Sequence, residues 1–154
     1  MKVRIDVDNS LTETEIIIKC SSVDDNVKLI KTKIQEATRE MPNIIFYKDG
    51  KEYYLETQSI LFFETEDSST YAHTKDNAYM TRYRLYELEE ILHKNFIRVS
   101  KSTIVNVNHI LSLSSSFGTS FVLEFNKSHK QVFVSRRYKK ILKERLEERN
   151  SYEK

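Results

Sequence analysis

The amino-acid sequence predicts a mainly β protein with short helices, of the α+β class. Three observations lead to this prediction. Short runs of β-branched and aromatic residues recur beyond residue 43, turn-forming residues separate these runs, and apolar residues show helical spacing in only three places. The chain has 154 residues with 39% apolar side chains, including 9 tyrosines and 8 phenylalanines, which is enough for one core or one core with a small appendage.

Residues 1–42 are expected to form a ββα segment. Val3, Ile5 and Val7 alternate with charged residues, which is the pattern of a half-buried strand. A β-branched run at 16–18 predicts a second strand, in which Cys20 would be a small buried side chain. An amphipathic helix follows, with apolar positions spaced by three or four residues: Val23, Val27, Ile30, Ile34 and Ala37. This helix is expected to end near Met41-Pro42, because the residue before a proline is disfavoured in the helical conformation.

The single proline marks the start of the second expected domain, residues 43–150. Its first hairpin is predicted by Asp49-Gly50, since both central positions of a tight hairpin turn favour positive φ. The elements expected first are strands 44–47, 53–55 and 60–63, an unpatterned polar loop 66–70, a hairpin of strands 71–74 and 78–81, and a helix through 85–92. They are followed by a short extended segment 96–99, a segment 100–107 with a polar start and an Ile104-Val105 core, strands 110–113, 121–125 and 132–134, and a terminal helix through 138–146 with Ser135 as its N-cap.

Composition excludes several classes of protein. The only glycines, Gly50 and Gly118, lie 68 positions apart, so neither a P-loop nor a dinucleotide fingerprint can form. A single cysteine excludes internal disulfides and cysteine-based zinc fingers. No apolar run approaches the roughly 20 residues of a membrane span, and the N-terminus lacks the apolar stretch of a signal peptide. We therefore expect a soluble, cytoplasmic protein.

The sequence offers no support for catalysis. The four histidines (His73, His93, His109 and His129) include no pair at i, i+4 spacing, so a metal site would need long-range assembly, and ordinary surface or strand histidines are the simpler interpretation. Ser100-Lys101 could pair a nucleophile with a base, but no nucleophile elbow accompanies it. Glu89-Glu90 fits a solvated helix face. We expect no enzyme activity, no metal, no cofactor and no small-molecule substrate.

Charge is distributed unevenly. Residues 1–66 hold 9 basic and 13 acidic side chains, a net charge of −4, whereas residues 67–154 hold 16 basic and 10 acidic, a net charge of +6. This asymmetry points to a polyanionic partner for the C-terminal part. The alternative is a solvated basic helix that is balanced by its own glutamates, Glu144, Glu147 and Glu148.

Three polar segments carry the cations and short hydroxyl donors that phosphate contacts need. They are 67–70, 98–102 and 134–140, and each adjoins an expected strand or helix. Solvated connectors are the alternative for all three. In the third segment, Arg136, Arg137, Lys139 and Lys140 crowd the first turn of a helix, where positive charge opposes the helix dipole unless an anion is bound nearby.

The same segments resemble the LytTR family of DNA-binding domains. Phe96 to Asn106 (FIRVSKSTIVN), followed by Ile110, is similar to the family signature of a phenylalanine, an arginine two positions on, a His-Arg/Lys-Ser triplet, an apolar pair and an asparagine. Ile60 to Glu64 (ILFFE) is similar to the strand before the first DNA loop of the family, and Val134 to Leu142 (VSRRYKKIL) resembles its closing strand-to-helix motif. The resemblance covers about residues 44–147.

The resemblance implies an elongated arrangement of small antiparallel sheets with short helices. It also implies a bacterial transcription regulator that binds direct repeats in promoter DNA through loops in successive major grooves. By position, together with the neighbouring cations, the expected DNA contacts are Ser68, Ser69, Thr70, Lys101, Ser102, Arg136, Arg137, Lys139 and Lys140. The histidine of the triplet is Ser100 here.

Family members usually follow a receiver domain, but residues 1–42 are too short for one and contain no aspartate-rich phosphorylation pocket. The resemblance therefore implies a stand-alone member, of the kind often paired with a membrane inhibitor protein. We expect residues 1–42 to serve as a dimerisation or signal-input module that makes the protein a homodimer. Two other functions stay open: a protein-interaction module that pairs exposed strands with a partner, and an RNA-binding domain that stacks bases on tyrosines.

Overall fold

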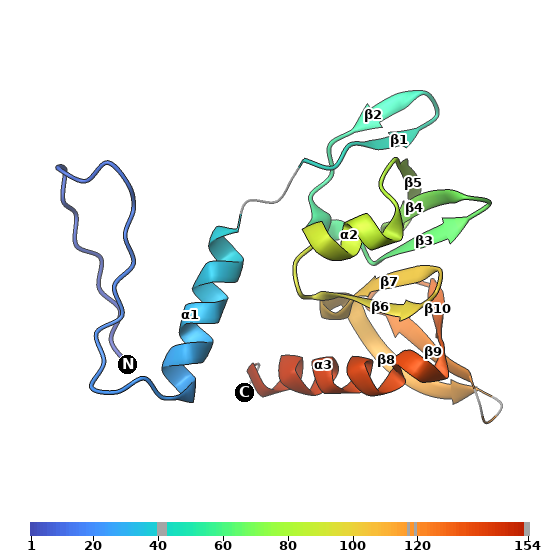
Figure 1. The fold of residues 1–154 in the computed structure, drawn as a ribbon. Helices are drawn as coiled ribbons and strands as arrows, with labels where there is room; N and C mark the ends of the chain where they lie inside the picture. Colours follow the sequence, from blue (N-terminus) through green and yellow to red (C-terminus); the bar gives the residue numbers. More distant parts are fainter. Residues whose placement is uncertain (40–42, 117, 119, 153–154) are drawn as a thin grey trace. The chain divides into compact units, whose positions relative to one another are not determined.

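The computed structural model describes residues 1–39, 43–116, 118 and 120–152 (Figure 1). These residues divide into two compact units, Met1–Arg39 and Glu40–Lys154. The expected boundary at residues 42 and 43 lies close to this division. Met41-Pro42, where the first helix was expected to end, lies outside the described residues.

The first unit contains one helix, α1 (Asp25–Thr38), in the place where the apolar spacing predicted it. Asp24 is its N-cap, and its Oδ1 accepts a hydrogen bond of 2.9 Å from the Val27 N–H. The two strands expected before this helix do not form: none of residues 1–24 belongs to a strand. The ββα prediction is therefore wrong in its ββ part.

The two expected strands fail to form because residues 1–24 offer no third strand and no packed face to stabilise them. A two-stranded ribbon without a packed face is marginal in water. The side chains of Val3, Ile5 and Val7 are 85–86% exposed, so alternation alone brought no burial. Cys20, expected to be buried in the second strand, is exposed as well.

The second unit is built around a seven-stranded antiparallel sheet with the order β2-β1-β5-β4-β3-β7-β6. The sequence pattern did not predict that these hairpins join into one sheet. The strands are β1 (Phe46–Lys48), β2 (Lys51–Tyr53), β3 (Phe62–Glu66), β4 (Ser69–His73), β5 (Ala78–Thr81), β6 (Phe96–Ser100) and β7 (Thr103–Asn106).

A second, three-stranded antiparallel sheet has the order β10-β9-β8. Its strands are β8 (Ile110–Ser116), β9 (Ser120–Phe125) and β10 (Gln131–Val134). Two helices complete the unit, α2 (Leu85–Ile91) and α3 (Lys139–Tyr152), and single 3-10 turns span Thr57–Ser59, Val107–His109 and Arg136–Tyr138. A mainly β protein with short helices is confirmed.

The two faces of the large sheet bury two separate cores. Consecutive strand residues point to opposite faces, so Phe62 and Phe63 of β3 contribute to different clusters, as do Ile104 and Val105 of β7. Phe63 and Ile104 pack with Leu85 and Leu88 of α2. The other core joins the large sheet to the three-stranded sheet and α3, through residues that include Phe62, Val105, Leu123, Phe125 and Leu142.

Most turns follow their sequence signals, with one correction. Asp49 and Gly50 have φ of 52° and 72° in the β1–β2 turn, as predicted. Residues 66–70, expected to be an unpatterned loop, instead comprise the end of β3, a two-residue turn at Asp67-Ser68 and the start of β4. Asp67 and Ser68 occupy the left-handed positions of this turn with φ of 46° and 67°. The loop prediction was wrong because this turn contains no glycine, which is the usual sequence signal for positive φ.

Candidate nucleic-acid interface

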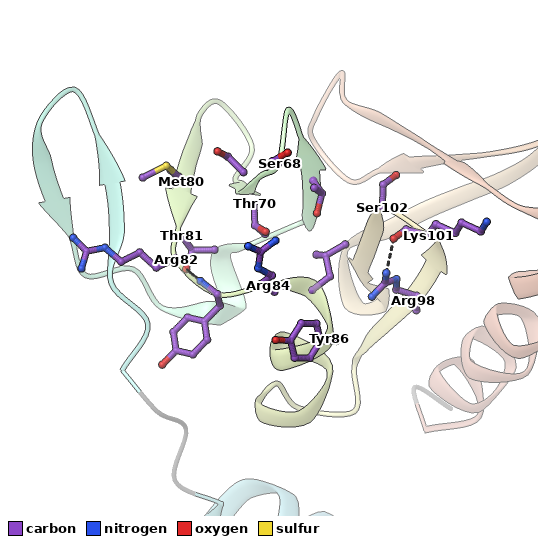
Figure 2. Close-up of a pocket in the computed structure, with 14 residues that line it drawn as sticks. Ser68, Thr70, Met80, Thr81, Arg82, Arg84, Tyr86, Arg98, Lys101 and Ser102 are labelled. Carbon is purple, nitrogen blue, oxygen red and sulfur yellow. Dashed lines mark hydrogen bonds between the residues drawn. The ribbon is translucent and has the colours of Figure 1, made fainter.

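Two of the three predicted segments lie side by side, at the same end of neighbouring strands of the large sheet. The β3–β4 turn presents Ser68 and Ser69, and the β6–β7 turn presents Lys101 and Ser102. The Thr65 N–H donates a hydrogen bond of 2.8 Å to the Ser102 carbonyl, which connects the two turns. Both border a groove of about 490 Å³, whose lining residues are drawn as sticks in Figure 2.

The β6–β7 turn is held by Arg98, a residue of the family signature. Its Nε donates to the Ser100 carbonyl at 2.8 Å, and Nη2 donates to the Lys101 carbonyl (Figure 2). Its Nη1 forms an ion pair of 3.1 Å with Glu89 of α2. Arg98 thus links the backbone of Ser100 and Lys101 to Glu89 of α2, and so holds the turn from which Lys101 projects.

Ser100, which stands in the place of the family histidine, turns its hydroxyl into the same turn. Its Oγ accepts a hydrogen bond of 3.2 Å from the Ser102 N–H. At this position the chain stabilises the turn itself.

The third segment is tied to the second through Val99. The Ser135 N–H donates to the Val99 carbonyl at 2.9 Å, at the point where the pairing of β6 with β7 shifts register. Ser135, predicted as the N-cap of the terminal helix, is the N-cap of the 3-10 turn Arg136–Tyr138 instead, and its side chain makes no cap hydrogen bond. Its hydroxyl donates to the same Val99 carbonyl at 3.4 Å. The 3-10 turn Arg136–Tyr138 precedes α3, which begins at Lys139.

The structure places the predicted contact residues unevenly. Ser68, Lys101, Ser102, Arg136, Arg137 and Lys140 are exposed, and Ser69 and Lys139 are half-buried. Thr70 is only 6% exposed, because it lies within β4 between Thr65 and Thr81. Lys139 Nζ lies 3.7 Å from the centre of the Phe121 ring, so part of its charge faces the protein. The groove takes in the predicted residues 68–70, 101 and 102, while those of the third segment lie outside its lining.

Two basic residues at the groove were not among the predicted contact residues. Arg82 and Arg84 lie on the connection between β5 and α2, and both are exposed. The Arg82 guanidinium stacks 4.8 Å from the centre of the Tyr47 ring. The sequence does show two arginines, Arg82 and Arg84, directly after the expected strand 78–81, but no sequence motif indicated that they lie beside residues 68–70.

Other kinds of site find no support in the part of the chain that the structure describes. No group of three or more histidine, cysteine, aspartate or glutamate side chains is arranged to hold a metal ion there. Among those residues, no helix is long and apolar enough to cross a membrane.

Comparison with known proteins agrees with the sequence motifs. Residues 50–147 match the family described as LytTr DNA-binding domain. The chain is 30% identical over 146 residues to an uncharacterized HTH-type transcriptional regulator of Staphylococcus aureus strain NCTC 8325, covering 95% of this chain and 98% of that protein. A relative in strain N315 is 29% identical with the same coverage.

A solved structure is similar in fold as well. A LytTr DNA-binding domain from Bacillus cereus superposes with a TM-score of 0.62 at 26% identity, over 68% of this chain and 97% of that one. The match to the staphylococcal regulators extends over the residues that precede the domain, whereas the match to the solved domain does not span the whole chain.

Proposed function

The chain belongs to the LytTR family of DNA-binding transcriptional regulators, which are not enzymes, and we propose that it inserts its three polar segments into successive major grooves at direct repeats in promoter DNA. The segments are the β3–β4 turn, the β6–β7 turn and residues 135–140. A cytoplasmic location, where promoter DNA is accessible, is part of the same proposal.

The observation that carries this proposal is the pair of hydrogen bonds that joins the three segments. Thr65 to Ser102 links the first segment to the second, and Ser135 to Val99 links the second to the third. Segments that lie far apart in the sequence are thereby held on one rigid framework. DNA recognition needs such a framework, because contacts at several points must be made in one fixed register.

The order of the elements favours turns over a recognition helix. The staphylococcal relatives are named HTH-type regulators. In this chain, five strands separate α2 from α3. The exposed residues of the segments have the chemistry that loops in a major groove need: hydroxyls at Ser68 and Ser102, and cations at Lys101 and Arg136.

We assign base recognition to Arg136 and test it by substitution. A bidentate guanidinium on a guanine contributes about 1–3 kcal/mol of discrimination. Arg136→Ala is expected to bind specific and scrambled duplexes equally well, whereas the wild type prefers a duplex selected from a random pool. Arg137→Ala is the companion variant, because the 3-10 turn presents both guanidinium groups. Unchanged discrimination in both variants would exclude a base-reading role for this segment.

Lys101 gives the second arm of the test. If its ammonium group contacts a phosphate, Lys101→Ala weakens specific and scrambled duplexes alike and lowers the salt dependence by about one counterion. If it contacts a base edge, only the specific affinity falls. Lys75→Ala, which removes the same charge at the opposite end of β4, is the matched control. Thermal melts must show that each variant is folded.

Two partner proposals accompany the DNA proposal. Residues 1–39 are proposed to mediate a homodimer, because their apolar side chains, among them Val3, Ile5, Val7 and Ile17, are exposed. Two protomers would also match the two copies of a direct repeat. A membrane inhibitor protein is the second proposed partner, and it rests on the family resemblance alone.

A further inference from the structure

We propose that the groove between the β3–β4 turn and the start of α2 is a binding site for the DNA backbone, in which Arg82 and Arg84 contact phosphodiester groups. This inference rests on the proposed function and deepens it. It extends the DNA interface from the three turns to the connection between β5 and α2.

The groove has a strongly unbalanced charge. Its lining contains four cationic side chains, Arg82, Arg84, Arg98 and Lys101, and no carboxylate. Glu66 at the end of β3 and Asp67 in the β3–β4 turn are neighbours of Thr65 and Ser68 in the sequence but are not part of the lining. A concave surface lined by one sign of charge concentrates ligands of the opposite sign.

The cationic side chains of the groove differ in whether they are already paired within the protein. Arg98 is paired with Glu89 and donates to two carbonyl groups, so its charge is largely used within the protein. Arg82 and Arg84 form no ion pair with a carboxylate in the described part of the chain. Two exposed guanidinium groups therefore remain for an external anion, and guanidinium matches the geometry of phosphate oxygens.

The backbone around these arginines is well ordered by hydrogen bonds. The Arg84 N–H donates to Glu87 Oε2 at 2.7 Å, and its carbonyl accepts from the Leu88 N–H at 3.0 Å. The Arg82 guanidinium is held against the Tyr47 ring. Both cations thus project from positions that the start of α2 and the sheet define, which lowers the entropy lost on binding.

The floor of the groove adds neutral hydroxyl groups. Thr65, Thr70 and Thr81 are cross-strand neighbours on β3, β4 and β5, and all three belong to the lining. Thr70 and Thr81 are buried, whereas Thr65 is exposed, so Thr65 offers its hydroxyl to a phosphate. Hydroxyl groups beside cations are typical phosphate-contacting groups in protein–DNA interfaces.

The position of the groove favours DNA as the source of the phosphate. The groove shares Ser68, Lys101 and Ser102 (Figure 2), together with Ser69, with the turns that are proposed to enter a major groove. A duplex whose major groove accepts those turns presents its backbone immediately beside them. The groove residues Arg82 and Arg84 then contact the strand that borders the same major groove.

The test compares Arg82→Gln, Arg84→Gln and the double variant with Lys75→Gln. Lys75 is exposed in the β4–β5 turn, at the end of β4 opposite the groove, so it controls for the loss of one positive charge. Binding is measured by fluorescence anisotropy with a duplex selected by the wild type and with a scrambled duplex, over a salt series from about 50 to 200 mM.

Each arginine variant is expected to bind both duplexes about 3–10-fold more weakly, with the preference for the selected duplex unchanged. The slope of log affinity against log salt should fall by about one for each phosphate that the variant no longer neutralises, and additively in the double variant. Lys75→Gln should retain the wild-type slope. Circular dichroism melts verify that the variants remain folded.

Two results would overturn this inference alone: a double variant with wild-type affinity and salt slope, or a loss confined to the selected duplex, which would make the arginines base-reading residues. A wild-type protein that binds no duplex would overturn the proposed function and this inference with it.

Discussion

Ser68 occupies a backbone position that a glycine would adopt at lower cost. Asp67 and Ser68 both have positive φ, 46° and 67°, like the Asp49-Gly50 pair of the β1–β2 turn. A residue with a Cβ in the left-handed region costs about 1 kcal/mol relative to glycine. The hydroxyl of Ser68 is exposed at the proposed DNA interface, so a serine is expected here despite the strain because its hydroxyl is proposed to contact DNA.

Ser68→Gly is therefore expected to raise the melting temperature while it weakens DNA binding. The gain should be up to about 1 kcal/mol in the free energy of unfolding, because the strain at φ 67° is relieved. Ser68→Ala is the matched control, since it removes the hydroxyl and keeps the strain. Thermal denaturation and DNA titrations of both variants provide the measurement. Wild-type affinity in both variants would show that this hydroxyl contacts no DNA.

At the scale of elements, the loop between β9 and β10 is fastened to the β4–β5 hairpin. Lys130 Nζ donates to the Asn77 carbonyl at 2.7 Å and lies 3.4 Å from Nδ1 of His73. The His73 ring stacks on Phe62 with centroids 4.2 Å apart. Burial, and next the nearby Lys130 charge, lower the pKa of His73 to about 4. The contact between the two sheets therefore contains a neutral histidine.

This histidine predicts that the folded state is less stable in mild acid. Between the unfolded pKa of 6.5 and the folded pKa of about 4, the unfolded chain binds the proton and the folded chain does not. The stabilisation is thus fully present above pH 6.5 and is lost as pH falls toward 4. Glu64 Oε2, 3.6 Å from His73 Nε2, attracts a protonated ring and reduces the loss.

Thermal melts between about pH 7.5 and pH 4.5 measure this effect. His73→Phe keeps an aromatic ring on Phe62 and cannot titrate, so its melting temperature should fall less than that of the wild type across this range. His129→Gln, a substitution of an exposed histidine, is the control. An equally steep decline in His73→Phe would assign the pH dependence to other groups.

At the scale of the whole molecule, the first unit has more apolar surface than its own helix covers. None of the residues of α1 is buried, and Val3, Ile5, Val7, Ile16, Ile17 and Val23 are at least 56% exposed. Apolar surface of this kind is typical of a segment that meets a partner.

Removal of residues 1–39 is expected to convert a dimer into a monomer and to weaken binding to a two-repeat duplex more than to a single repeat. The second unit has its own two cores, so it should stay folded. Light scattering at micromolar concentration and DNA titrations measure both effects. A monomeric full-length protein would contradict the dimer, and an aggregating truncated protein would show that the segment belongs to the core of the second unit.

The features of this protein that the sequence predicted correctly are those that depend on neighbouring residues. Asp49-Gly50 predicted its turn, the spacing of Leu85 and Leu88 predicted α2, and the motif from Phe96 to Asn106 predicted the family. Each of these signals lies within about ten residues, because turn geometry, helical period and motif chemistry act over short stretches of chain.

Long-range pairing settled the rest. Alternation at Val3–Val7 predicted a strand, but a strand forms only where a partner and a packed face exist, and residues 1–24 have neither in the described structure. The union of β1–β7 in one sheet and the hydrogen bond from Thr65 to Ser102 join residues well separated in sequence, and the same groove is lined by Ser68 and Arg84. No local pattern encodes such neighbours, since they depend on how every strand between them is paired.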